Sequence, residues 1–256
     1  MSALRVGVLV QPQHTTYSSF AGAVRQVESL GVDTIWDWDH FFPCWGDAHG
    51  SAFEGWTLLT AMATLTARAE IGCLVTCNSY RSPDLLADMA RTIDHISAGR
   101  LILGIGAGWF ERDYLAYGYP FGTPRSRLEH LEKNLPLILE RWLQLTPRPT
   151  RQIPILIGGG GEKVTLRLAA RYADIWNGFG PAAEYAHKNQ VLDDWCAQVG
   201  RDPREIERSV TLDTDDIPGC LEPFVEAGAS HVIVHLSEPW NFAKIEKLVR
   251  WKESLV

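Results

Sequence analysis

Short apolar runs alternate along the chain with segments whose apolar residues recur at helical spacing. Residues 4–10 (LRVGVLV) form a β-rich apolar run, and residues 18–30 then place apolar side chains on one side of a helix. Gly31 follows directly, as glycine commonly does after the last turn of a helix. The start of the chain therefore predicts one strand followed by one helix.

This alternation continues to the end of the chain. The pattern predicts eight strands, over residues 4–10, 33–38, 70–76, 101–105, 153–157, 174–177, 206–212 and 231–236. It predicts eight helices, over residues 18–30, 56–68, 83–96, 126–143, 163–173, 184–199, 219–228 and 241–252.

Alternating strands and helices imply an α/β fold with a parallel sheet, and eight such units in about 250 residues imply a closed (β/α)8 TIM barrel. We expect residues 1–256 to form this barrel as a single domain. An open doubly wound sheet is the alternative. That fold usually carries its glycine fingerprint after the first strand, whereas the four glycines here follow the fifth.

Composition narrows the classes of partner. The net charge of −7 argues against a nucleic-acid partner, which needs a basic face. The five cysteines are odd in number and fit no usual zinc spacing, so we expect reduced thiols and no metal site. The N-terminal sequence lacks the features of a signal peptide, and its apolar run is too short to cross a membrane. We therefore expect a cytoplasmic protein without a membrane partner.

The active site of such a barrel forms at the carboxyl ends of its strands. The residues at these ends are mainly polar or glycine, whereas the strands behind them are apolar, and this contrast indicates a site. In chain order the ends carry Gln11, Gln13 and His14; Asp39 and His40; Cys77, Asn78 and Tyr80; Gly106 to Gly108; Gly158 to Gly161; Trp176 and Asn177; and His235.

The segment from Ile157 to Val164 (IGGGGEKV) predicts a phosphate site. Glycines let backbone N–H groups approach a phosphate closely, and the helix that follows offers unpaired donors and a favourable dipole. A tight turn without a ligand is the alternative, but four consecutive glycines exceed what such a turn needs.

His40 is the candidate for proton transfer, because a histidine at a strand end exchanges protons near neutral pH. A structural histidine bonded to its own loop is the alternative. Asp39 is expected on the opposite side of the strand, where it would brace the barrel mouth. Any of Glu111, Arg112 and Asp113 could belong to the site, although such a charge run is usually a solvated face.

Ten tryptophans are many for this length, and several fall near strand ends. An aromatic pocket suits a flat cofactor, and the small residues Gly106, Ala107 and Gly108 would permit close approach of its ring. Ordinary core filling explains Trp36 or Trp38 equally well.

Several blocks resemble the luciferase-like flavin and deazaflavin oxidoreductases. These blocks are residues 38–42 (WDHFF), 75–83 (VTCNSYRSP) and 94–121. Residues 158–177 and 185–202 resemble a subgroup described as coenzyme F420-dependent. The resemblance covers nearly the whole chain.

The resemblance implies a (β/α)8 barrel whose cofactor ring lies across the mouth and whose phosphate tail reaches Gly158, Gly159 and Gly160. It implies a non-proline cis peptide around residues 73–75 and a homodimer. In related sugar-phosphate dehydrogenases a histidine and a tryptophan serve the active site, and His40 and Trp45 match them. Those enzymes also use a glutamate after the fourth strand. Glu111 is displaced from that position, which argues against glucose 6-phosphate as the substrate.

Family members usually carry a longer excursion before the fifth strand than the ten residues between Trp142 and Ile153. We therefore expect a short or absent lid over the substrate and an open site.

We predict an oxidoreductase that transfers hydride between coenzyme F420 and a small organic substrate. His40 is the predicted catalytic residue. Predicted cofactor contacts are Asp39, Cys77, Asn78, Gly106, Ala107, Gly108, Gly158, Gly159, Gly160, Trp176 and Asn177. Predicted substrate contacts are His14, Trp45 and Glu111. The alternatives are an FMN-dependent luciferase-like monooxygenase and a non-catalytic flavin-binding barrel.

Overall fold

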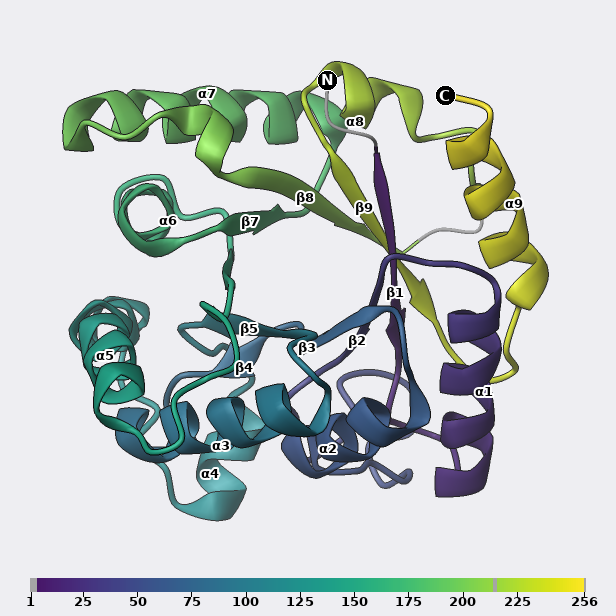
Figure 1. Cartoon of the computed structure of the whole chain (residues 1–256), viewed down its shortest axis with the longest axis horizontal. Helices are drawn as coiled ribbons and strands as arrows, with labels where there is room; N and C mark the ends of the chain where they lie inside the picture. The colour runs from purple at the N-terminus through teal and green to yellow at the C-terminus, as the bar shows by residue number, and fades with distance from the viewer. Residues whose placement is uncertain (1–3, 214–215, 256) are drawn as a thin grey trace.

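In the computed structural model, the chain forms a barrel of parallel strands inside a ring of helices (Figure 1). The structure describes residues 4–213 and 216–255, so the outermost ends of the domain expected over 1–256 lie outside the described residues. The strands are β1 (Arg5–Val10), β2 (Thr34–Asp37), β3 (Glu70–Cys73), β4 (Thr76–Cys77), β5 (Leu101–Gly106), β6 (Ile155–Gly158), β7 (Ile175–Gly178), β8 (Glu207–Leu212) and β9 (His231–Leu236).

The α-helices surround these strands. They are α1 (Tyr17–Ser29), α2 (Gly55–Leu65), α3 (Pro83–Ile96), α4 (Glu111–Tyr117), α5 (Pro124–Gln144), α6 (Thr165–Tyr172), α7 (Ala182–Val199), α8 (Glu222–Glu226) and α9 (Phe242–Glu253), with a 3-10 turn at Pro203–Glu205. The expected alternation of strands and helices is confirmed. Two differences are local: α8 is shorter than the helix expected over 219–228, and α4 was not expected.

The sheet closes through its third strand. The strand order is β3-β2-β1-β9-β8-β7-β6-β5-β4, and β3 also pairs with β5. The strand expected over residues 70–76 is therefore one barrel strand in two parts, β3 and β4. The peptide between Leu74 and Val75 is cis, as the resemblance implied. Counted this way the barrel has eight strands, and the (β/α)8 fold is confirmed.

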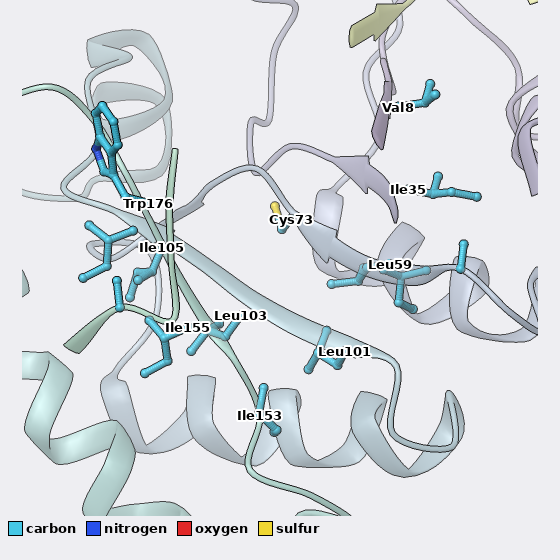
Figure 2. Packing of buried hydrophobic residues seen from close by; sticks show 14 of the residues in the cluster. Val8, Ile35, Leu59, Cys73, Leu101, Leu103, Ile105, Ile153, Ile155 and Trp176 are labelled. Carbon is cyan, nitrogen blue, oxygen red and sulfur yellow. The ribbon is translucent and has the colours of Figure 1, made fainter. Parts of the chain in front are cut away.

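The hydrophobic core has two layers because successive side chains of each strand point to opposite faces. The outer layer lies between strands and helices and includes Val8, Ile35 and Leu103 (Figure 2). The inner layer fills the barrel interior with Leu9, Trp36, Trp38, Ile102, Leu156, Ile175 and Ile233.

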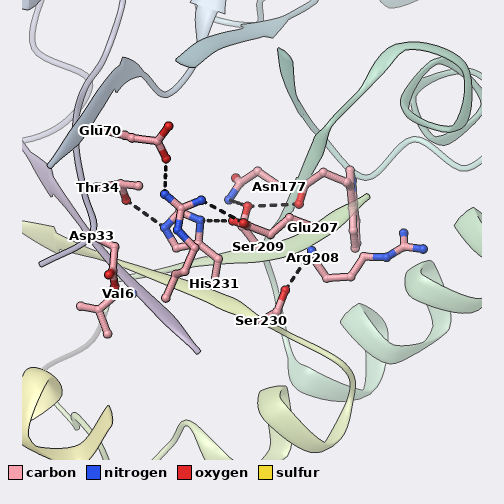
Figure 3. Close-up of polar contacts among 12 residues, drawn as sticks. Val6, Asp33, Thr34, Glu70, Asn177, Glu207, Arg208, Ser209, Ser230 and His231 are labelled. Carbon is pink, nitrogen blue, oxygen red and sulfur yellow. Dashed lines mark hydrogen bonds and ion pairs between the residues drawn. The ribbon is translucent and has the colours of Figure 1, made fainter. Parts of the chain in front are cut away.

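Trp36 occupies the interior next to positions that must be glycine. A side-chain carbon at Gly72 would lie 2.5 Å from the indole of Trp36. The buried Trp36 Nε1 donates to Thr34 Oγ1 at 2.8 Å, and Thr34 Oγ1 lies 2.8 Å from His231 Nε2. His231 Nδ1 in turn donates to Glu207 Oε1 at 2.6 Å (Figure 3). The indole is therefore buried without losing its hydrogen bond.

Charged side chains close the N-terminal end of the barrel. Arg5 donates to Glu207 at 2.9 Å and to Glu70 at 2.5 Å, and Arg151 donates to Glu70 at 2.6 Å. Burial alone would raise the pKa of Glu207, but the hydrogen bonds and charges of His231 and Arg5 outweigh it and lower that pKa. This end is stabilised by charge pairing and contains no candidate chemistry that the sequence singled out.

The segment between α5 and β6, whose shortness suggested a short or absent lid and an open site, also lies at this end. Thr150 donates through its backbone and hydroxyl to Asp94, and Arg151 reaches Glu70. Helix-to-strand links of this fold lie opposite the active-site face. The length of this segment therefore has no bearing on how open the site is. Within the described part of the chain, no helix is long and apolar enough to span a membrane.

We predict that Glu207→Gln lowers the free energy of unfolding by about 2 kcal/mol at pH 7, because Arg5 and His231 lose a charged partner. A carboxyl with a lowered folded-state pKa stabilises above its ordinary pKa of 4.5, and that stabilisation is lost as the pH falls below it. Urea unfolding should therefore show the two proteins converging in acid.

Glu129→Ala is the control, because Glu129 pairs with Arg125 on an exposed helix face and should leave the unfolding midpoint unchanged. Equal stability of wild type and Glu207→Gln at pH 7 would contradict a stabilising role for the network.

Candidate functional site

A cavity of about 570 Å³ opens at the carboxyl ends of the strands. This volume is typical of small-molecule and cofactor sites. Ten of the residues predicted for the site line it: Asp39, His40, Trp45, Cys77, Gly106, Ala107, Gly108, Gly158, Gly159 and Asn177. Leu9 and Trp38 belong both to its lining and to the inner core layer, so that layer forms the cavity floor. At the mouth Trp109 and Phe179 are 61% and 56% exposed.

One wall is made of backbone and small residues from β5 and β6. Side-chain carbons added at Gly106 and Gly158 would lie 2.7 Å and 2.8 Å from methyl groups of Val75. Gly108 has φ +83°, a left-handed conformation that favours glycine, and an added carbon would lie 2.1 Å from the Tyr114 hydroxyl. The wall is therefore held flat, as a broad planar ring requires.

His40 lies at the end of β2 and is held by a residue of α4. Its Nδ1 donates to Asp113 Oδ2 at 2.8 Å. Asp113 is fully buried and also accepts from the Phe41 backbone at 3.2 Å and from the Tyr80 hydroxyl at 3.1 Å. With Nδ1 bound in this way, the neutral ring carries its lone pair on Nε2. His40 therefore suits proton exchange with a ligand in the cavity.

Asp39 is hydrogen-bonded to other residues of the barrel mouth. Its two carboxylate oxygens accept from Arg81 at 2.7 Å and 2.9 Å, and one also accepts from the Cys77 backbone at 2.9 Å. Burial would lower the pKa of Arg81, but Asp39 and Glu54 outweigh it and raise that pKa. Asp39 thus ties the end of β2 to β4, which is the bracing role weighed from the sequence.

The glycine run leads from β6 to the N-terminus of α6, and Thr165, the first residue of α6, lines the cavity. Lys188 of α7 is buried beside this run: a side-chain carbon at Gly160 would lie 2.6 Å from its Nζ. Its ammonium group pairs with Glu184 and lies 5.8 Å from the ring centre of Phe179. The run therefore combines backbone donors with a nearby positive charge, which suits a phosphate.

His235, at the end of β9, forms the opposite wall with two tryptophans. Its ring stacks on Trp45 at 6.0 Å and 18°, and meets Trp38 edge-on at 6.5 Å. Gln11 Nε2 lies 3.2 Å from His235 Nδ1. Burial lowers the pKa of His235, an effect that the charge of Asp213 partly opposes. The neutral imidazole is therefore the favoured form.

Five predicted residues do not line the cavity. Trp176 is buried behind it and donates to the Gly159 carbonyl at 2.9 Å, and Asn78 accepts from Asn134 at 3.1 Å. The exposed His14 bonds the Trp45 carbonyl at 2.9 Å, so it supports the wall from outside. Glu111 is exposed at the start of α4, and Gly160 faces Lys188.

The sequence did not point to Lys188, and it named Asp113 only within a charge run and His235 only as a strand-end residue without a role. Asp113 sits in a charge run that resembles a solvated face, and its partner His40 is 73 positions away. Lys188 lies within a helix that has no motif of its own. His235 does fall at a strand end, and the alternation of β9 was the available signal.

We predict that Cys44, although it lines the cavity, reacts very slowly with thiol reagents. Burial, followed by the charge of Asp113, raises its pKa from 9.0 to about 12. The reactive thiolate at pH 8 is then about 10³-fold rarer than in an ordinary cysteine. Iodoacetamide labelling followed by peptide mass spectrometry measures this rate. The urea-unfolded protein is the control, and labelling of folded Cys44 at the unfolded rate would contradict the prediction.

Comparisons with known proteins bear on the family and the fold of the chain. Residues 3–214 match the family described as luciferase-like monooxygenase. An uncharacterized protein of Mycobacterium tuberculosis is 28% identical over 246 residues, covering 83% of this chain and 85% of that protein. An F420-dependent glucose-6-phosphate dehydrogenase of Amycolatopsis mediterranei is 30% identical over 169 residues. That match covers 59% of this chain and 50% of the dehydrogenase.

The fold also matches a solved structure described as an F420-dependent secondary alcohol dehydrogenase in complex with an F420-acetone adduct. The TM-score is 0.85 at 16% identity, and the match covers 96% of this chain and 97% of that one. At this identity the likeness concerns the fold.

Proposed function

This chain belongs to the luciferase-like monooxygenase family, and from that premise we propose that it is an oxidoreductase that uses coenzyme F420. The observation that carries the proposal is one cavity lined both by the glycine wall and by His40, whose Nδ1 donates to the buried Asp113. The relatives described as F420-dependent support the choice of coenzyme. The proposed substrate is a small organic molecule.

The residues present fit a deazaflavin with a phosphate tail. Gly106 to Gly108 and Gly158 leave room for a planar ring, and the cavity continues to Gly159 and Thr165 at the start of α6. Lys188 lies beyond them with its ammonium group against Gly160. Backbone N–H groups and this cation would hold the phosphate, while the glycine wall would hold the ring.

When bound, the coenzyme would supply or accept a hydride, that is, two electrons and one proton, at a carbon atom of the substrate. His40 would account for the remaining proton through Nε2, giving it to or taking it from the substrate oxygen. Asp113 would keep the imidazole in the required orientation through Nδ1. Trp38, Trp45 and Trp109 would exclude water from the reacting atoms.

We predict that the purified protein binds F420 with a dissociation constant of about 1 μM or lower, and FMN at least about tenfold more weakly. Fluorescence titration of the two cofactors side by side measures this difference. Preference for FMN would instead favour a flavin-dependent monooxygenase. Binding of neither would remove the redox proposal and leave the fold intact.

The phosphate site is tested by Lys188→Met in the same titration. Loss of a charge-assisted contact should weaken F420 binding by about tenfold. Binding of the deazaflavin chromophore without its phosphate tail should not change. Lys247→Met is the matched control, because Lys247 is exposed on α9 and does not line the cavity. If Lys188→Met weakened F420 and the tail-free chromophore equally, the phosphate tail would not bind beside Lys188.

A further prediction concerns the tautomer of His40. Nitrogen-15 NMR of the wild type should show the ring proton on Nδ1, because Asp113 accepts it. Asp113→Ala should move the population toward Nε2–H. Glu111→Ala, an exposed change on the same helix, should leave it unaltered. An unchanged Nδ1–H tautomer in Asp113→Ala would show that Asp113 does not set the proton position.

The homodimer and the cytoplasmic location stay predictions, which light scattering and cell fractionation can test.

A further inference from the structure

The cavity has two unlike halves, and they follow the strand order around the barrel. The glycine wall comes from β5 and β6, whereas Trp38, His40 and His235 come from the ends of β2 and β9, on the other side of the sheet order. A ring held on the glycine wall leaves the aromatic half for the substrate. His235 therefore lies in the substrate half, next to Trp45.

His235 is held so that one particular atom is available. Trp45 stacks on its ring and Trp38 meets it edge-on, which fixes the plane of the imidazole. Gln11, itself only 3% exposed, donates from Nε2 to His235 Nδ1 at 3.2 Å. In the neutral ring the hydrogen is then on Nε2, so the imidazole presents an N–H donor.

The charge of this half disfavours an anionic substrate. Among the described residues that line the cavity there is no lysine and no arginine. Asp213 also lines it, with Oδ2 3.9 Å from His235 Nδ1. An anion brought here would meet this carboxylate without a lining lysine or arginine to replace its hydration, because Lys244, whose charge acts on His235, does not line the cavity.

We propose that His235 is a specificity-determining residue that donates from Nε2 to an uncharged acceptor oxygen, and that the substrates are neutral, largely apolar carbonyl compounds or alcohols rather than carboxylates or phosphate esters. This inference rests on the proposed function, because the coenzyme ring on the glycine wall assigns the aromatic half to the substrate. Trp38 lies between the two imidazoles, with ring centres 6.2 Å from His40 and 6.5 Å from His235. His40 thus transfers the proton, and His235 recognises the acceptor oxygen of the substrate.

Three probes of similar shape separate the chemistry: acetophenone with a neutral carbonyl, benzoate with a charge, and ethylbenzene without an acceptor. Each is titrated by ligand-observed NMR into protein loaded with oxidised F420, which cannot reduce the ketone. We expect acetophenone to bind at least about tenfold more tightly than benzoate and several-fold more tightly than ethylbenzene.

His235→Phe keeps a flat ring against Trp45 and removes the donor. It should weaken acetophenone binding by about tenfold and leave ethylbenzene binding unchanged. His235→Gln restores an N–H donor and should recover part of the loss. His95→Phe is the matched control, since His95 bonds the Arg148 carbonyl at the far end of the barrel and should alter neither ligand.

Tighter binding of benzoate, an unchanged acetophenone affinity in His235→Phe, or failure of all three probes to bind would each overturn the inference. If F420 itself does not bind, the proposed function fails separately. The same three titrations into cofactor-free protein then decide the recognition claim, with the same outcomes for and against it.

Discussion

The structure depends on a tryptophan that stands inside the barrel with its one polar atom satisfied. Trp36 fills space that Gly72 leaves open, and its indole nitrogen donates to Thr34. From Thr34 the hydrogen bonds pass through His231 to Glu207, where Arg5 supplies the compensating charge. These hydrogen-bonded residues fill the barrel near its N-terminal end. Toward the cavity, the inner core layer ends in Leu9 and Trp38. The cavity therefore has a fixed floor.

The two walls above that floor differ in the size of their side chains. At the carboxyl ends of β5 and β6, Gly106 and Gly158 have no side chain, so the backbone itself forms part of the surface. On the other side of the cavity, Trp38 and Trp45, which follow β2, pack against His40 and His235 and hold the two imidazoles at set angles. A planar cofactor gains contact area from the first wall, and a substrate gains orientation from the second. In His40 and His235 one ring nitrogen is already hydrogen-bonded, by Asp113 and Gln11 respectively. Each imidazole therefore has one nitrogen, Nε2, left for a ligand.

The order of strands and helices could be predicted from the sequence because local hydrophobic periodicity carries that information. The residues at strand ends followed from the fold, and most of them line the cavity. What failed depends on distant partners. Asp113 reads locally as part of a solvated charge run, yet it is buried against His40. Beyond the strand ends the alternation of side chains no longer applies, so His14 and Glu111 were placed in the cavity although they lie outside it. The length of the segment before β6 suggested an open site, but a link from a helix to a strand lies at the opposite end of the barrel and does not affect the cavity.

The contact between His40 and Asp113 also constrains how such a protein can change. Loops at the mouth of a barrel of this kind are usually independent of one another, so that each can be exchanged without disturbing the rest. Here the loop after β2 carries the imidazole and α4, after β5, carries the carboxylate that orients it. Arg112, next to Asp113, also bonds the Ala48 carbonyl and lies over Phe42, so the two loops are joined at several points. Divergence toward new substrates would then proceed through the β8 and β9 ends, where loops vary without cost to proton transfer, and the β2 and β5 loops would evolve as a single unit.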